Sequence, residues 1–204
     1  MAKFANKLKG SGKKRSGAEK AKAQLRRQIL EMIENPSVFD AFAGHGAMHD
    51  AVWKDADRYV GCDLDYWRDS RYAFVADNRR VMRSIDLTGF NIFDFDAFGS
   101  PWEQVWIMIR RRPVQPGERL GVILTEGSGL TMRTGGISRA QSLISGVSIR
   151  QPGMSRQQDF VLDRSIAGMT TEMKCTLENR LQAKGRTGAS MRYVGLVFKG
   201  LKER

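Results

Sequence analysis

The stretch that decides the fold is residues 38–46, Val-Phe-Asp-Ala-Phe-Ala-Gly-His-Gly. It begins as a short apolar run, as a buried strand does, and ends in Gly44 and Gly46. These glycines let the backbone turn tightly and approach a ligand without a Cβ in the way. A helix pattern follows, with Ala47, Met48, Ala51 and Val52 on one face. A Gly-x-Gly between a strand and a helix is therefore a candidate ligand-binding turn.

The alternation of strand and helix signals continues along the chain. Further short apolar runs occupy residues 58–62, 73–76, 90–95 and 120–124. Strands that alternate with helices predict a parallel sheet with right-handed crossovers. Two closing strands, at 173–177 and 193–198, predict an antiparallel hairpin. The predicted fold class is α/β: a Rossmann-like, doubly wound, mostly parallel sheet with a C-terminal antiparallel hairpin on its edge.

Local signals predict several helix boundaries. Residues 100–103, Ser-Pro-Trp-Glu, have the form of a capping box with proline at the first helical position. Residues 126–153 are rich in Gly, Ser and Thr, which favours a long loop with one short helix at 138–145. Ser155 and Gln158 predict a cap for a helix that ends near Gly168.

Positive charge is concentrated at the N-terminus. The formal net charge is +12, and residues 1–27 contain ten Lys and Arg against Glu19, which leaves only +3 for the rest. A basic arm on a near-neutral body suggests attraction to phosphates. We name Lys13, Lys14, Arg15, Arg26 and Arg27 as candidate nucleic-acid contacts. A solvated tail that only keeps the protein soluble is the alternative.

The pattern predicts a basic disordered arm at 1–17 and a single domain at 18–204. Within that domain we expect a docking helix at 18–34, a cofactor-binding core at 38–125, and a substrate loop with closing strands at 126–204. The apolar stretches are too short for a membrane span, and two cysteines suit a reduced compartment. We expect a cytoplasmic protein with no membrane contact and no metal, and a protein partner is possible.

Carboxylates follow the strands of the predicted core. Asp40 could hold a ligand ammonium, Asp63 could accept hydrogen bonds from two ribose hydroxyls, and Asp77 could accept one from an adenine amino group. An Asp after a strand is also often a turn former or a helix cap, and that alternative stays open for Asp63 and Asp77. His49 replaces the third glycine of a dinucleotide fingerprint, and no Gly-Lys-Ser/Thr follows. The predicted ligand is therefore one that carries adenosine but no phosphates.

Three stretches carry a family resemblance: residues 38–46, residues 59–65 (Tyr-Val-Gly-Cys-Asp-Leu-Asp) and residues 94–101 (Asp-Phe-Asp-Ala-Phe-Gly-Ser-Pro). Together they resemble the ordered motifs of class I methyltransferases that depend on S-adenosylmethionine (SAM). The resemblance implies SAM as cofactor and assigns it the following residues: Asp40, Phe42, Gly44, Gly46, Asp63, Leu64 and Asp77.

The stretch after the fourth strand resembles the Asp-x-Asp-Pro-Phe-Gly-Ser-Pro of tRNA guanine dimethyltransferases, with Ala97 where that family has proline. The resemblance implies methylation of an exocyclic amine of a nucleic-acid base, in RNA or DNA. Asp96, with Asp94 and nearby carbonyls, would accept the hydrogens of the amine, and Phe98 would stack on the base. The alternative is a purely structural role, in which the two carboxylates cap the strand end and Phe98 fills the core.

Ala97 also keeps a different class of function open: a catalytically faded methyltransferase fold that binds nucleic acid or a protein partner. The two classes differ in whether bound nucleic acid becomes methylated.

Overall fold

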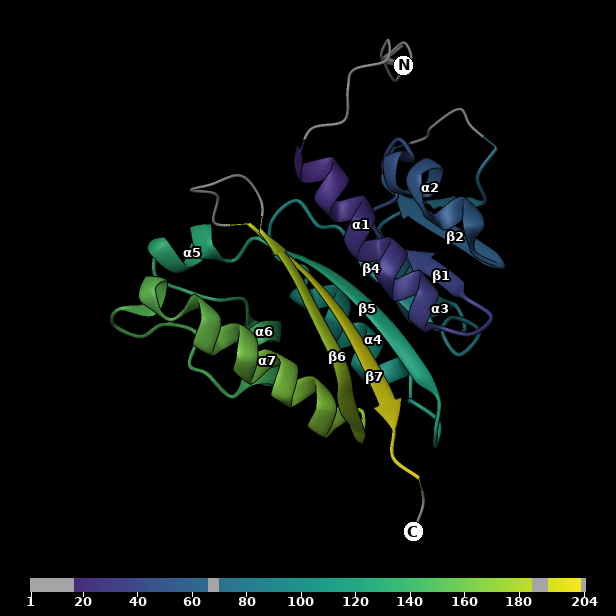
Figure 1. Cartoon of the computed structure of the whole chain (residues 1–204). Helices are drawn as coiled ribbons and strands as arrows, with labels where there is room; N and C mark the ends of the chain where they lie inside the picture. Colours follow the sequence, from purple (N-terminus) through teal and green to yellow (C-terminus); the bar gives the residue numbers. More distant parts are fainter. Residues whose placement is uncertain (1–16, 66–69, 185–190, 203–204) are drawn as a thin grey trace.

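A seven-stranded sheet crosses the whole molecule in the computed structural model, which describes residues 17–65, 70–184 and 191–202 (Figure 1). Its strands are β1 (Ser37–Asp40), β2 (Arg58–Asp63), β3 (Ala73–Val75), β4 (Ile92–Phe95), β5 (Arg119–Glu126), β6 (Cys175–Lys184) and β7 (Arg192–Gly200). The strand order is β3-β2-β1-β4-β5-β7-β6. The first five strands pair in parallel, and β7 is antiparallel to both β5 and β6. The predicted fold class is confirmed.

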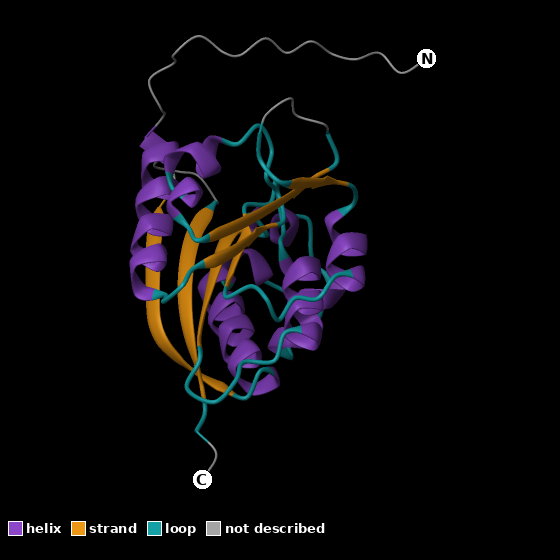
Figure 2. Cartoon of the chain, turned by 90° about the vertical axis from the view of Figure 1, so that its right-hand side faces the viewer, coloured by secondary structure: helices purple, strands orange, loops and turns teal. Residues whose placement is uncertain are grey.

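Helices cover both faces of this sheet (Figure 2). They are α1 (Gly17–Met32), α2 (Ala47–Ala51), α3 (Asn78–Ser84), α4 (Trp102–Arg111), α5 (Gly129–Arg133), α6 (Arg139–Ser145) and α7 (Gln158–Glu172), with single 3-10 turns η1 (Trp53–Asp55) and η2 (Met154–Arg156). The buried side chains of each strand point alternately to the two faces of the sheet and so belong to two different cores. Val38 and Ile92 pack with α1 and α2, whereas Phe39 and Phe93 pack in the larger core with α3, α4, α6 and α7.

Helix α1 lies unusually close to the sheet because glycines face it. A Cβ added to Gly121 of β5 would lie 2.8 Å from Ile29, and one added to Gly195 of β7 would lie 3.1 Å from the same side chain. Ile29 itself is fully buried. The close approach fixes α1 across β5 and β7, and it brings the polar side chains of α1 to the end of β4.

Several boundary predictions are wrong. Strand β6 runs from Cys175 to Lys184 and not over 173–177, and Ser155 lies in η2 and does not cap α7. Helix α4 begins at Trp102, one residue later than the capping box required, and the buried Ser100 hydroxyl has no hydrogen-bond partner. Helix α7 runs four residues beyond Gly168, from Gln158 to Glu172. Gly168 lies inside the helix, where it allows α7 to approach α6 closely. A Cβ added to Gly168 would lie 1.8 Å from the carbonyl oxygen of Ile144.

The segment between β5 and α7 is more ordered than a long loop. The predicted short helix is present as α6 with Ser138 as its N-cap, but α5 and η2 were not predicted. A separate small core of Met132, Ile137, Val147, Met154 and Val161 stabilises this segment. In the part of the chain that the structure describes, no helix has the length and hydropathy of a membrane span.

Candidate functional site

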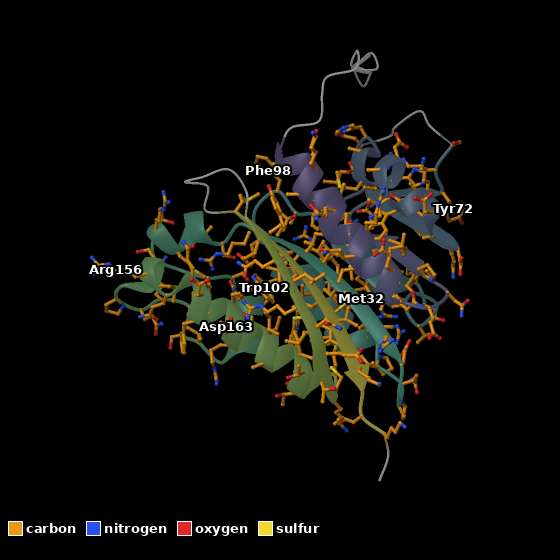
Figure 3. The ribbon with its side chains drawn as sticks, viewed as in Figure 1. Met32, Tyr72, Phe98, Trp102, Arg156 and Asp163 are labelled. Atoms are coloured by element: carbon orange, nitrogen blue, oxygen red, sulfur yellow. The ribbon has the colours of Figure 1, made fainter. Side chains whose placement is uncertain are left out.

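The predicted site residues gather where the order of the sheet reverses. Strand β1 lies between β2 and β4, and Asp40 and Asp94 are register partners at the ends of β1 and β4. In open α/β sheets ligands bind beyond the carboxyl ends of the strands at such a switch point. This carboxyl edge is the upper edge of the sheet in Figure 1, and Phe98 lies there in Figure 3.

The Gly-rich turn and the second strand are joined by a hydrogen bond. The backbone N–H of Gly44 donates to Oδ2 of Asp63 at 2.7 Å, and the N–H of Asp65 donates to Oδ1 at 2.9 Å. Gly44 and Gly46 both have positive φ angles, 45° and 85°, which explains why glycine is required there. Asp63 is half-buried, and the neighbouring Leu64 is exposed. The structure thus brings Gly44 and Asp63, two of the residues that the sequence assigned to one ligand, into direct contact.

Arg71 also lies on this turn, and no sequence signal predicted it. Its guanidinium donates to the carbonyl oxygens of Ala43 at 3.0 Å and Gly44 at 2.7 Å. A Cβ added to Gly46 would lie 2.9 Å from Cζ of Arg71. The turn therefore presents a cation as well as backbone groups.

Asp40 lies beneath the turn and is buried. Its carboxyl group accepts from the backbone N–H of Phe42 at 3.1 Å and from the hydroxyl of Tyr59 at 3.1 Å. Burial, and then the negative charge of Asp94, raises the pKa of Asp40 to about 8. A cation bound above it would favour the ionised carboxylate.

Asp77 caps helix α3. Its side chain accepts from the backbone N–H of Arg79 at 2.9 Å and forms an ion pair with the guanidinium of the same residue at 2.8 Å. The hydrogen bonds from the side chain and backbone of Arg79 lower the pKa of Asp77 to about 2. The helix-cap alternative is therefore correct, whereas an adenine contact stays a prediction.

Asp94 is a buried counter-ion, which corrects its assignment to catalysis. Its carboxylate accepts from Arg26 Nε at 2.6 Å, Arg26 Nη2 at 2.8 Å and Trp53 Nε1 at 2.8 Å. Asp94 and Arg26 are both fully buried. A substrate cannot reach a carboxylate that is buried and bound on both oxygens. Arg26 is for the same reason not a phosphate contact, and that prediction is wrong.

Asp96 lies at the open end of the same ion-pair network. Its Oδ1 accepts from Lys22 Nζ at 2.6 Å and from the Thr125 hydroxyl at 2.6 Å, and its Oδ2 lies 3.2 Å from Arg26 Nη2. The side chains of Lys22 and Asp96 are 21% and 16% exposed. Burial works to raise the pKa of Asp96, but the charges of Arg26 and Lys22 outweigh it and hold that pKa below its usual value.

The loop after β4 displays one aromatic ring. Phe98 is fully exposed, which excludes the alternative that it fills the core. The loop is held by the N–H of Gly127, which donates to the carbonyl oxygen of Gly99 at 2.9 Å. Trp102 Nε1 donates to the buried Glu126 at the end of β5, and burial raises the pKa of that glutamate.

Of the other predicted basic contacts, Arg27 is exposed and donates to the carbonyl oxygen of Ala51 at 2.7 Å. Lys13, Lys14 and Arg15 lie outside the described residues. Lys22 and Thr125 are site residues that were missed. Thr125 ends a parallel strand and could have been found by that rule, whereas the position of Lys22 depends on the docking of α1.

The sequence matches no protein-family profile and no curated protein. The structure is similar to the N-methyltransferase NodS from Bradyrhizobium japonicum WM9, at 12% identity over 90% of this chain and 96% of that chain, with a TM-score of 0.52. NodS in complex with S-adenosylhomocysteine gives 12% identity, coverage of 89% and 86%, and a TM-score of 0.51. The 1,6-didemethyltoxoflavin-N1-methyltransferase of Burkholderia thailandensis, with its substrate and S-adenosylhomocysteine bound, gives 14% identity, coverage of 90% and 80%, and a TM-score of 0.51. This chain therefore has the Rossmann-like fold of SAM-dependent methyltransferases.

Proposed function

We propose that the protein is a SAM-dependent methyltransferase. The observation that supports this most is the hydrogen bond between Gly44 and Asp63, because it joins a glycine turn to a strand-end carboxylate at the switch point. A half-buried carboxylate there suits the two hydroxyls of a ribose, and the turn lacks the lysine and third glycine that a pyrophosphate would need.

The residues of the cofactor side suit the parts of SAM. Gly44, Gly46 and Phe42 would contact the methionine part, and Asp40, buried beneath the turn, would supply negative charge below its ammonium rather than a direct contact. Arg71, whose guanidinium binds the carbonyl oxygens of Ala43 and Gly44, adds positive charge near its carboxylate. Asp63 and Leu64 would hold the ribose, and Asp77 would hold the adenine. SAM supplies an electrophilic methyl group on a sulfonium.

For the acceptor, the proposal is an exocyclic amine of a nucleic-acid base. Such an amine is a weak nucleophile because its lone pair is delocalised into the ring. Asp96 would accept an amine hydrogen and orient the amine, and its lowered pKa keeps it ionised for that purpose. Phe98 would stack on the base, since base stacking on an exposed ring is favourable.

Lys22 occupies the place that this acceptor needs. Its ammonium and the Thr125 hydroxyl already bind Oδ1 of Asp96, and Lys22 also lies 5.1 Å from the centroid of the Tyr193 ring. An amine that binds this oxygen must displace the ammonium. This observation favours a second candidate function, a faded methyltransferase fold in which Asp96 is only a counter-ion and nucleic acid or a protein partner is bound without transfer.

Calorimetry with SAM and S-adenosylhomocysteine tests the cofactor proposal. Asp63→Ala should raise the Kd for both, by roughly tenfold to a hundredfold if hydrogen bonds to a charged group contribute about 1.5–3 kcal/mol. Asp65→Ala is the matched control, because Asp65 is exposed and adjacent. Well-folded wild-type protein that binds neither ligand would contradict the proposal.

Transfer of a labelled methyl group to RNA, DNA or protein tests the acceptor side. Asp96→Asn should abolish labelling of nucleic acid while SAM binding persists. Lys22→Met should preserve labelling or raise it, because it removes one of the two donors that bind Oδ1 of Asp96. If the wild type binds nucleic acid and SAM but labels nothing, the alternative of a methyltransferase fold without catalytic activity is correct.

A further inference from the structure

The segment between β5 and α7 forms a small lobe beside the loop after β4, which carries Phe98 and which we call the acceptor loop. We call residues 127–157 the arginine lobe. It contains α5, α6 and η2, and Ile137 N–H donates to the carbonyl oxygen of Ile149 at 3.0 Å to close it. Four of its apolar side chains pack with Val161 of α7 in a small buried core.

All the charged side chains of the arginine lobe are positive. Residues 127–158 contain no Asp or Glu, and four arginines lie in this stretch: Arg133, Arg139, Arg150 and Arg156. All four are exposed. Within residues 17–65, 70–184 and 191–202, none of them takes part in an ion pair or a side-chain hydrogen bond.

The neighbouring carboxylates are engaged elsewhere. On α7, Asp159 pairs with Arg192 at 2.7 Å, and Asp163 pairs with Arg180 at 2.6 Å. Glu126, at the base of the lobe, is buried and accepts from Trp102. The four arginines thus have no acidic partner among the described residues, and their charges are available to a ligand.

Short contacts within the lobe connect the segments that carry three of these arginines: Arg133, Arg150 and Arg156. A Cβ added to Gly136 would lie 3.6 Å from Cγ of Arg150, and the N–H of Gly136 donates to Thr131 of α5, the helix that ends at Arg133. Turn η2, which contains Arg156, packs on α5. Arg156 lies at the outer end of the lobe and points away from the sheet (Figure 3).

The root of the lobe is fixed to the acceptor loop. A Cβ added to Gly127 would lie 2.5 Å from the carbonyl oxygen of Gly99, so these two backbones are in direct contact. Phe98 precedes Gly99 and is fully exposed. A chain whose base stacks on Phe98 would therefore have the beginning of the arginine lobe beside it.

We propose that the arginine lobe binds the phosphodiester backbone of the nucleic acid whose base is presented at Phe98 and Asp96. This inference rests on the proposed function. Guanidinium groups suit phosphate because they donate two parallel hydrogen bonds, and they bind without reading sequence. The lobe is a second phosphate-binding surface, separate from the basic arm at 1–17.

The test is binding of labelled single-stranded and duplex RNA and DNA by the full chain over a range of salt concentrations. The variant Arg133→Gln/Arg150→Gln/Arg156→Gln should flatten the slope of log affinity against log salt by about 0.9 for each duplex phosphate that the lobe no longer neutralises, or about 0.7 for a single strand. The control Arg83→Gln/Arg110→Gln/Arg111→Gln removes the same charge from exposed positions at the ends of α3 and α4. These lie at the opposite, amino edge of the sheet, where Arg112 binds the carbonyl oxygen of Phe90 before β4.

A flatter slope in the lobe variant, with the control unchanged, would support the inference. Equal slopes in both variants, or a wild type that binds no nucleic acid, would overturn it. Calorimetry of SAM on the same variants separates this failure from failure of the proposed function, because the cofactor residues lie outside the lobe. Intact SAM binding with an unchanged slope would reject the arginine lobe alone.

Discussion

The two halves of the carboxyl edge are held together in different ways. On the side of the proposed cofactor, Asp63 accepts from the backbone N–H groups of Gly44 and Asp65. Asp77 accepts from the backbone N–H of Arg79, two residues further along the chain. On the acceptor side, Asp94 and Asp96 bind cations of α1 that are 68 and 74 residues away in the chain. The cofactor side is therefore encoded by local motifs, and the acceptor side by tertiary docking.

The largest effect should come from breaking the acceptor-side network. Arg26→Met leaves the buried Asp94 without its cation, and removal of one partner of a buried pair costs about 3–5 kcal/mol. Arg27→Met, which removes an exposed neighbour that donates to one carbonyl, should cost about 1 kcal/mol or less. Denaturant unfolding of both variants measures the difference, and similar reductions in stability would contradict the role given to Arg26.

An exposed aromatic ring on each side sharpens the comparison. Phe98→Ala should weaken binding of nucleic acid by about 1–3 kcal/mol, the usual contribution of one stacked base. Tyr72→Ala is the matched control, because Tyr72 is 70% exposed and lies on the cofactor side (Figure 3). Fluorescence anisotropy measures both, and an equal reduction in the two variants would show that Phe98 has no special role.

The smallest effect concerns the cap of α3. Asp77→Ala should cost about 1 kcal/mol at neutral pH, as removal of an N-cap usually does. Because the folded pKa of Asp77 is lowered to about 2, its contribution is present above the unfolded pKa and is lost as pH falls through that folded value.

Asp77→Asn is the control for this prediction, since asparagine also caps helices but does not titrate. It should stay as stable as the wild type at neutral pH and lose less stability in acid. If Asp77→Ala unfolds with the same midpoint as the wild type at neutral pH, the cap contributes nothing.

The sequence predicted the sheet, and it placed Gly44 and Asp63 at one edge of it, because both rest on local patterns, whereas Arg71 was missed. Strand periodicity, the two glycines and the following Asp63 are separate signals that agree with one another. It misjudged Arg26, because a basic residue on an amphipathic helix reads as solvated, and only the close packing of Ile29 against Gly121 and Gly195 turns that residue inward.

Alternation could have placed Asp94 more accurately. Residues two apart on a strand share a face, so Asp94 and Asp96 lie on the face of Ile92, which is the face covered by α1. Apart from α6, the structure of the arginine lobe could not be predicted from pattern, because its small core joins single residues of α5, η2 and α7 with Ile137 and Val147 of the connecting segments.

The docking of α1 also sets an order of assembly. Helix α1 is synthesised before the strands of this sheet, yet it packs on β7, the strand of the sheet that is made after the others, as well as on β5. Contacts between distant parts of a chain must wait for loop closure, and domains emerge N-terminus first during synthesis. Until β7 is made, α1 therefore lacks part of the surface on which it packs, and the pair between Arg26 and Asp94 has no support from the contact of Ile29 with Gly195.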